Sequence, residues 1–118
     1  MKVKDIDNIT IYIEDLNKTM RFYHETLDLP IVKKSDYMIT FQLGKQKLNC
    51  SLINDEDNSN NLPSIGSGNL TILVKDPIEV IKAHLENYFI DLIEFSKENK
   101  SIKFLDPDQN LIEIISNN

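Results

Sequence analysis

Residues 7–15 read Asp-Asn-Ile-Thr-Ile-Tyr-Ile-Glu-Asp, and residues 68–76 read Gly-Asn-Leu-Thr-Ile-Leu-Val-Lys-Asp. Asn8 recurs as Asn69 and Thr10 as Thr71, a shift of 61 residues (8 to 69) in a chain of 118. The chain therefore repeats one unit, and an internal repeat constrains the fold before any local pattern does. Because two copies are too few for a solenoid, we expect two related sheet modules paired about a pseudo-two-fold axis.

The composition is typical of one globular domain spanning 1–118. A length of 118 residues with 41% hydrophobic content is enough for one core. No apolar run approaches the ~18–20 residues that span a bilayer, and no signal peptide precedes the first strand pattern, so we expect no membrane partner. The single cysteine, Cys50, excludes an internal disulfide, which fits a reducing cytoplasm.

The formal net charge is −6, and no cluster of Lys or Arg stands out. This balance argues against nucleic acid as the main partner. It permits a cationic ligand, and solubility alone is the alternative interpretation.

The first module, 1–53, reads as β-α-β-β-β. Apolar alternation predicts strands over 6–13, 29–34, 37–43 and 46–53. Asp15 is suited to cap a helix over 16–27, whose apolar stripe is Leu16, Met20, Tyr23 and Leu27.

Residues 54–68 lack apolar periodicity and carry turn formers, which predicts an exposed linker. The second module, 69–118, repeats the same order. After its first strand, Asp76-Pro77-Ile78-Glu79 predicts a helix with Asp76 as the N-cap and Pro77 at the first helical position. Strands are expected near 91–95, 101–105 and 110–115, with a turn at 106–110 joining the last two.

Polar side chains gather on one face of the predicted strands, opposite the apolar face that packs under the helices. They are Asn8, Thr10, Tyr12, Thr40, Gln42, Asn49, Ser51, Asn69, Thr71, Lys103 and Glu113. An antiparallel sheet often has one solvated polar face, which is one interpretation. If two such half-sheets face each other, the same residues line a concave cleft suited to a small ligand, and the duplication favours this interpretation.

The order of these motifs resembles the vicinal oxygen chelate superfamily, which includes glyoxalase I, bleomycin-resistance proteins, extradiol dioxygenases and fosfomycin-resistance transferases. The opening segment, Ile6 to Leu16 followed by Phe22-Tyr23, is similar to the start of that fold. Residues 104–114 (Phe-Leu-Asp-Pro-Asp-Gln-Asn-Leu-Ile-Glu-Ile) are similar to its closing motif, with Gln109 where the family usually has Gly. The resemblance implies an α+β fold in which two paired β-α-β-β-β modules form a curved mixed sheet around a cleft.

The resemblance also implies where a metal would bind. Metal-dependent members use a first-strand His, a His or Gln that opens the second module, the closing Glu and sometimes a residue of the last strand of module one. In this sequence those positions are Asn8, Asn69, Glu113 and Ser51, of which only Glu113 matches. Zn²⁺ and Fe²⁺ sites of this kind favour imidazole with carboxylate, so we expect no cofactor, although loose binding of a hard divalent ion stays open.

Other reactive side chains do not replace those ligands. His24 and His84 fall on the predicted helices, with His24 exposed, and Cys50 alternates toward the helix side as a buried thiol. Glu113 near Lys103 has two interpretations, a general base or a structural hydrogen-bonded pair. Tyr12 and Tyr37 have two as well, stacking on a ligand or ordinary packing.

Two functions follow. The first is a metal-free binding protein of the bleomycin-resistance type, a cytoplasmic homodimer that sequesters a small molecule, for which the acidic charge permits a cation. The alternative is a glyoxalase-like enzyme (lyase, isomerase, dioxygenase or thiol transferase) with a divergent metal site that uses Glu113. A third option, a module that binds only a protein partner, stays open.

Overall fold

The computed structural model describes residues 1–53 and 65–118, which form two compact units, Met1–Ile65 and Gly66–Asn118. Each unit contains a strand, a helical segment and three further strands, so the predicted repeat of β-α-β-β-β is confirmed. Most of the predicted linker, residues 54–64, lies outside the described residues. No helix within 1–53 or 65–118 is long and apolar enough to cross a membrane.

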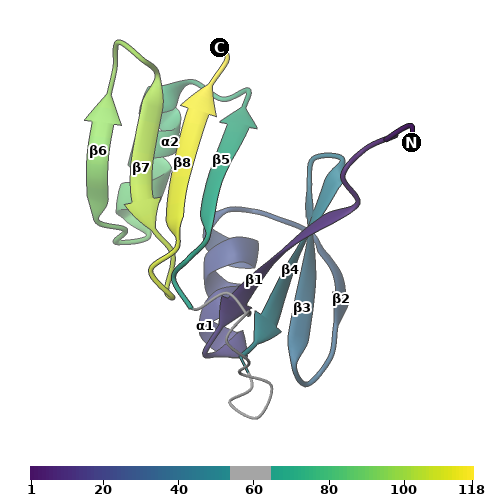
Figure 1. Cartoon of the computed structure of the whole chain (residues 1–118). Helices are drawn as coiled ribbons and strands as arrows, with labels where there is room; N and C mark the ends of the chain where they lie inside the picture. Colours follow the sequence, from purple (N-terminus) through teal and green to yellow (C-terminus); the bar gives the residue numbers. More distant parts are fainter. Residues whose placement is uncertain (54–64) are drawn as a thin grey trace. The chain divides into compact units, whose positions relative to one another are not determined.

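The first unit consists of β1 (Asn8–Ile13), α1 (Leu16–Met20), the π-helix η1 (Arg21–Thr26), β2 (Ile31–Lys34), β3 (Met38–Leu43) and β4 (Gln46–Leu52). Its four strands form one sheet in the order β1-β4-β3-β2 (Figure 1). The β1–β4 pair is parallel and the other two pairs are antiparallel. The parallel pair arises because the helical crossover returns the chain to the sheet in the original direction.

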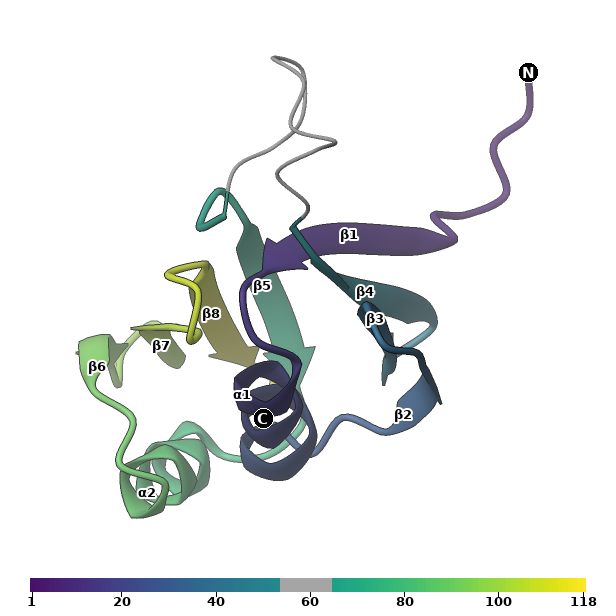
Figure 2. The same ribbon diagram turned by 90° about the horizontal axis from the view of Figure 1, so that it is seen from below.

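The second unit repeats this plan with β5 (Asn69–Val74), α2 (Ile78–Asn87), β6 (Leu92–Ser96), β7 (Ser101–Leu105) and β8 (Leu111–Ser116). The strand order is β5-β8-β7-β6, with β5 and β8 parallel. Figure 2 shows α2 lying on one side of this sheet. The expected mixed sheet is thus present as two four-stranded sheets, one in each unit.

Both helical segments begin close to their predicted starts. Asp15 caps α1 as expected, since its carboxylate accepts a hydrogen bond from the Lys18 amide at 2.9 Å. The prediction of Asp76 as the cap of α2 is wrong by one position, because Pro77 occupies the N-cap and Ile78 is the first helical residue. Pro77 has ψ 144°, which is extended, while its carbonyl already accepts hydrogen bonds from the amides of Val80 and Ile81.

Each core lies between the helical segment and one face of its own sheet. In the first unit the buried strand residues are Ile11, Ile13, Ile39, Phe41, Leu48 and Cys50. The Tyr23 ring from η1 packs over this face, with its centroid 5.6 Å from that of Phe41. The predicted burial of Cys50 on the helix side is therefore confirmed.

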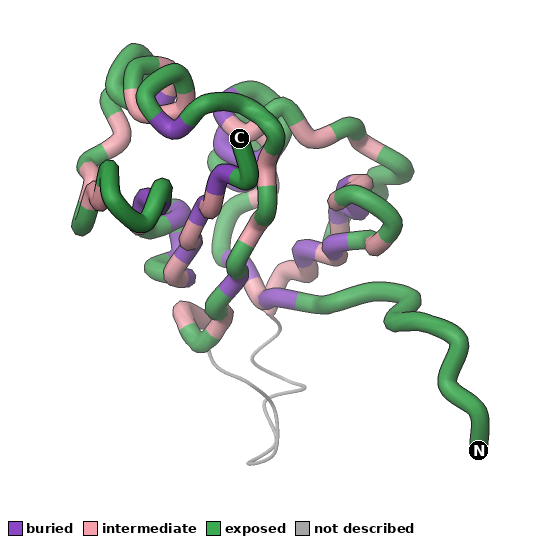
Figure 3. Tube along the Cα trace, turned by 90° about the horizontal axis from the view of Figure 1, so that it is seen from above, coloured by how far each residue is buried: buried purple, intermediate pink, exposed green. Residues whose placement is uncertain are grey.

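In the second unit, Ile78 and Leu85 of α2 pack on the buried strand residues Leu70, Ile102, Phe104, Ile112 and Ile114. Buried and more exposed residues alternate along the strands, as Figure 3 shows for the trace of both units. This period of two is the one that the sequence pattern predicts for half-buried strands. It leaves the predicted polar residues on the opposite face of each sheet, which in the second unit also carries Leu73, Leu105, Leu111 and Ile115.

The turn between β7 and β8 is held by a buried polar network. One oxygen of Asp106 accepts hydrogen bonds from the amides of Asp108 and Asn110, at 2.9 and 2.8 Å, and the other accepts from Nδ2 of Asn110 at 2.9 Å. Oδ1 of Asn110 accepts from the amide of Gly68 at 2.7 Å, just before β5. The family's closing motif thus acts here as a structural clamp between the ends of two strands.

Gln109 occupies the position in this turn where the family usually has Gly, and its φ is +71°. This left-handed conformation costs a residue with a Cβ about 1–2 kcal/mol, and glycine adopts it readily. The fold is retained, because the hydrogen bonds around Asp106 fix the turn despite this strain.

We predict that Gln109→Gly stabilises the protein by about 1 kcal/mol, because it removes this strain. The expected rise in melting temperature is about 3–5 °C by calorimetry. Gln109→Ala is the matched control, since it keeps the Cβ and should give no such rise. A Gly variant that melts at or below the wild-type temperature would contradict the prediction.

Candidate functional site

The residues predicted to bind a ligand lie on the open face of each sheet, opposite the face that packs under its helices. In the first unit these are Asn8, Thr10, Tyr12, Thr40, Gln42 and Ser51, and in the second they are Asn69, Thr71, Lys103 and Glu113. Their strand positions alternate with the buried core residues. The structure brings the members of each group together within one unit, and their union in one cleft stays a prediction.

Strand register places a corresponding row of four side chains across the middle of each open face. In the first unit the row is Thr10, Asn49, Thr40 and Lys33. In the second it is Thr71, Glu113, Lys103 and Glu94. The framework is the same in both, but the first row contains amide and hydroxyl groups with one terminal lysine, whereas the second alternates carboxylate and ammonium.

The polar groups of the first face partly serve the local structure. The hydroxyl of Thr40, which is only 1% exposed, donates to Oδ1 of Asn49 at 2.8 Å. Nε2 of Gln42 donates to the carbonyls of Gly44 and Gln46, at 2.8 and 3.1 Å, and so holds the β3–β4 turn. The Gln42 amide nitrogen is therefore engaged by the hairpin, which the sequence pattern did not indicate.

The charged row of the second face contains one lysine between two glutamates. Nζ of Lys103 lies 3.6 Å from Oε2 of Glu94. The hydroxyl of Thr71 donates to Oε1 of Glu113 over 3.5 Å, at the outer limit of a hydrogen bond. Glu94 was missed from the sequence, although its place on the predicted strand 91–95 could have revealed it.

The open faces present a donor set that does not fit a transition metal. Register pairs Glu113 with Thr71 on β5 and pairs Asn49 with Thr10 on β1, so the counterpart of Glu113 in the first unit is Asn49 rather than the predicted Ser51. Lys47 stands directly opposite Asn8, which places a cation beside one predicted ligand position. Neither unit has an imidazole at these positions, and amide oxygens with a single carboxylate are weak ligands for Zn²⁺ or Fe²⁺.

Other potential ligands are also scattered. Within residues 1–53 and 65–118, no three or more side chains of His, Cys, Asp or Glu are grouped so that they could hold a metal ion. His24 is exposed on η1, as expected, and its Nδ1 lies 2.9 Å from the carbonyl oxygen of Leu29. His84 belongs to α2, and its ring centroid lies 5.0 Å from that of Tyr88.

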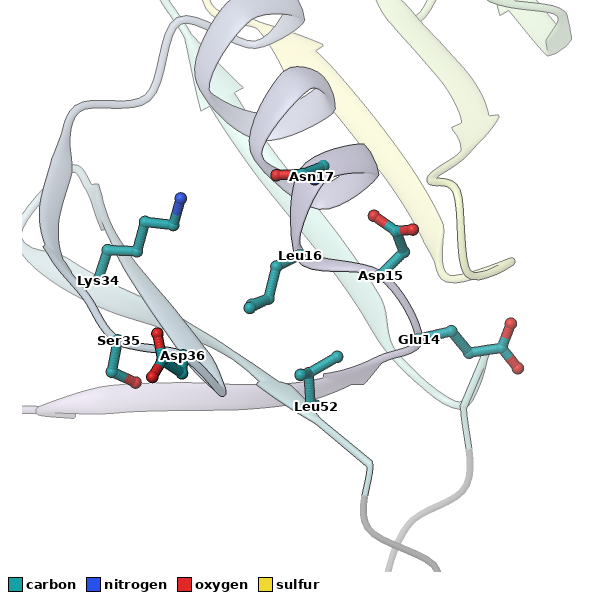
Figure 4. Close-up of a pocket in the computed structure, with 8 residues that line it drawn as sticks. All are labelled: Glu14, Asp15, Leu16, Asn17, Lys34, Ser35, Asp36 and Leu52. Atoms are coloured by element: carbon teal, nitrogen blue, oxygen red, sulfur yellow. The ribbon is translucent and has the colours of Figure 1, made fainter.

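A shallow pocket of about 360 Å³ lies at one end of the first unit and contains none of the predicted ligand residues. It is formed where β1 leads into α1, where β2 turns into β3 and where β4 ends. Its lining residues are Glu14, Asp15, Leu16, Asn17, Lys34, Ser35, Asp36 and Leu52 (Figure 4). The carboxylate of Asp15 caps α1 and the hydroxyl of Ser35 accepts from the Met38 amide at 3.2 Å, so part of this polar lining maintains the local structure.

Comparison with known proteins identifies the family. The family model described as the Glyoxalase/Bleomycin resistance protein/Dioxygenase superfamily matches residues 5–114. The chain therefore belongs to this superfamily, which confirms the resemblance inferred from its opening and closing motifs.

Two relatives match along nearly the whole chain. The glyoxalase domain-containing protein RDO1 of Mycosarcoma maydis is 29% identical over 124 residues, which cover 98% of this chain and 70% of that protein. Virulence protein STM3117 of Salmonella typhimurium is 29% identical over 122 residues, covering 97% of this chain and 85% of that protein. The crystal structure of STM3117 matches with a TM-score of 0.83, covering 98% of each chain at 28% identity.

The structure of lactoylglutathione lyase from Agrobacterium tumefaciens matches with a TM-score of 0.81 at 20% identity, covering 98% of this chain and 96% of that one. At this level of identity the likeness concerns the fold alone, because unrelated activities share one fold.

We predict that Asn110→Ala destabilises the protein by about 2–4 kcal/mol. Asn110 is 1% exposed, and its loss removes the acceptor of the Gly68 amide and one of the hydrogen-bond donors to the Asp106 carboxylate. Chemical denaturation measures the change, with Asn117→Ala at an exposed position as the control. An Asn110 variant with the same free energy of unfolding as this control would show that these hydrogen bonds do not stabilise the protein.

Proposed function

We propose that this protein binds a small molecule on the open faces of its sheets without a metal ion, and sequesters it rather than transforming it. The observation that carries the proposal is the donor set at the family's metal positions, where the closing Glu113 is accompanied by Asn8 and Asn69. Lys47 lies opposite Asn8 on the neighbouring strand, and the Asn8 side-chain amide donates to the carboxylate of Asp7 at 2.8 Å. Without a metal there is no Lewis acid to polarise a carbonyl or activate oxygen.

The ligand is proposed to carry a cationic or hydrogen-bond-donating group that contacts Glu113. This carboxylate is half-buried, and among the described residues its hydrogen-bond partner is the neutral hydroxyl of Thr71 at 3.5 Å. A carboxylate in that setting gains from a charged donor, because charge-assisted hydrogen bonds are shorter and stronger than neutral ones.

By analogy with bleomycin-resistance proteins, we further propose a homodimer in the cytoplasm, where the buried thiol of Cys50 stays reduced. Light scattering on the purified protein tests the oligomeric state. A mass equal to that of one chain at micromolar concentration would reject the dimer.

A glyoxalase-like enzyme is the second candidate, because Glu113 keeps the family's position and stands directly opposite Lys103. In that case Glu113 acts as a general base on a bound substrate. Turnover of any substrate by the wild type that disappears in Glu113→Gln would favour this candidate over sequestration.

We predict that the wild-type protein, purified without chelator, carries less than roughly one tenth of an equivalent of any divalent metal. Elemental analysis measures this content. Adding Ni²⁺, Zn²⁺ or Mn²⁺ should leave the melting temperature unchanged, because a tightly bound ligand would raise it by mass action. A stoichiometric metal whose stabilising effect is lost in Glu113→Gln would instead establish a metal site.

We predict that Glu113→Gln weakens the binding of a cationic ligand by about tenfold or more, because it removes the charge and keeps the shape. Isothermal calorimetry on cationic and aromatic small molecules supplies both the ligand and the measurement. Glu79→Gln, an exposed change in the first turn of α2, is the matched control. If no compound in such a screen binds the wild type, the proposed function fails.

A further inference from the structure

The charged row of the second unit contains an opposite-charge pair, Lys103 and Glu113, whose charged groups contact other residues of the row. Lys103 and Glu113 are directly opposite in the β7–β8 register. The Lys103 ammonium nevertheless lies 3.6 Å from Glu94 on the other neighbouring strand, and Glu113 contacts Thr71. Lys103 and Glu113 therefore lie on adjacent strands, which are spaced about 4.8 Å apart in a sheet, while their charged groups contact other partners.

Apolar side chains border this row on the same face. Leu73 and Ile115 are paired on one side, and Leu105 and Leu111 are paired on the other. Leu73 is 66% exposed and Leu105 is 37% exposed, whereas Ile115 and Leu111 are half-buried. A ligand whose charged end reaches the row therefore finds an apolar surface for its remaining atoms.

The order of charges along the row restricts which ligand is complementary to it. A simple cation on Glu113 would be close to the like charge of Lys103, and a simple anion on Lys103 would be flanked by Glu94 and Glu113. A diamine that contacts both Glu113 and Glu94 would have to lie across Lys103, whose charge has the same sign. A molecule whose ammonium and carboxylate are attached to the same carbon meets Glu113 and Lys103 with the correct sign at both.

The contact between Lys103 and Glu94 does not prevent such binding. Their side chains are 36% and 55% exposed. Exposed ion pairs of this kind contribute little to stability, since water screens them. A ligand carboxylate can therefore replace Glu94 as the partner of Lys103 at little cost.

We propose that the open face of the second unit recognises the zwitterionic head of an α-amino acid with an apolar or aromatic side chain. Glu113 accepts hydrogen bonds from the ligand ammonium, Lys103 donates to its carboxylate, and the ligand side chain packs on Leu73 and Ile115. The proposal rests on the proposed binding function and deepens it, because it adds an obligatory negative group to the cation expected at Glu113.

Calorimetry with matched compounds tests this inference. L-Leucine is compared with 3-methylbutan-1-amine, which lacks the carboxylate, and with 4-methylpentanoate, which lacks the amine. L-Phenylalanine is compared in the same way with 2-phenylethylamine and 3-phenylpropanoate. We expect at least one amino acid to bind about tenfold more tightly than either of its two analogues.

Two substitutions assign the charges. Lys103→Met should remove the preference for the amino acid over the amine, whereas Lys103→Arg should keep it. Glu113→Gln should weaken the binding of both compounds. Lys97→Met and Glu98→Gln, at exposed positions after β6, are the controls and should change neither affinity.

The outcomes separate the two proposals. If the amines bind as tightly as the amino acids and depend on Glu113, the zwitterion is overturned while a cation-binding protein remains. The zwitterion is overturned if none of the six compounds binds the wild type, or if Lys103→Met leaves the preference for the amino acid intact. In either case the proposed function is tested separately, by the calorimetric screen of cationic and aromatic compounds described above.

Discussion

The carboxylate of Asp106 is the central acceptor of the hydrogen bonds that fix the β7–β8 turn of the second unit. It accepts hydrogen bonds from the backbone amides of Asp108 and Asn110 and from the side-chain amide of Asn110. The side-chain oxygen of Asn110 in turn accepts a hydrogen bond from the amide of Gly68. The Leu111 amide donates to the Gly68 carbonyl at 3.0 Å, so the first residues of β5 and β8 are fixed side by side. That register is what sets Thr71 beside Glu113 and Glu113 beside Lys103.

The first unit reaches the same arrangement with less reinforcement. Its β3–β4 turn is short, with Gly44 at φ +61°, and the amide of Lys47 lies 3.4 Å from the carbonyl of Asp7. Register there depends mainly on the burial of alternate side chains, since a slip by one residue would turn the core residues outward. Duplication has therefore preserved the sheet plan while the two units came to use different local contacts.

The local charges of the open faces also differ from the overall charge of −6. Lys33 and Lys47 lie on the open face of the first unit, whose other groups there are amides, hydroxyls and apolar side chains. Glu94 and Glu113 flank Lys103 on the second. Net charge describes solubility and long-range attraction, whereas a bound molecule responds to the few groups that it touches.

The sequence predicted the element order, the core face and the buried position of Cys50, because these follow from the period of apolar residues and from the Asp15 cap. It did not reveal that Asn49 rather than Ser51 corresponds to Glu113. The offset between corresponding residues of the two units grows along the chain, from 61 for β1 and β5 (10 to 71) to 63 for β3 and β7 (40 to 103) and 64 for β4 and β8 (49 to 113). The pairing of strands that are far apart in the sequence determines these offsets, and the local conformation of the β3–β4 turn determines that Gln42 donates to its own hairpin.

The burial of Cys50 gives the chain a built-in reporter of local opening. The chain has one cysteine, and its side chain is fully enclosed between β1, β3 and the helical segment. A thiol reagent reaches such a group only when the surrounding structure opens. The rate at which the native protein is alkylated therefore measures how often the structure around β1, β3 and the helical segment opens.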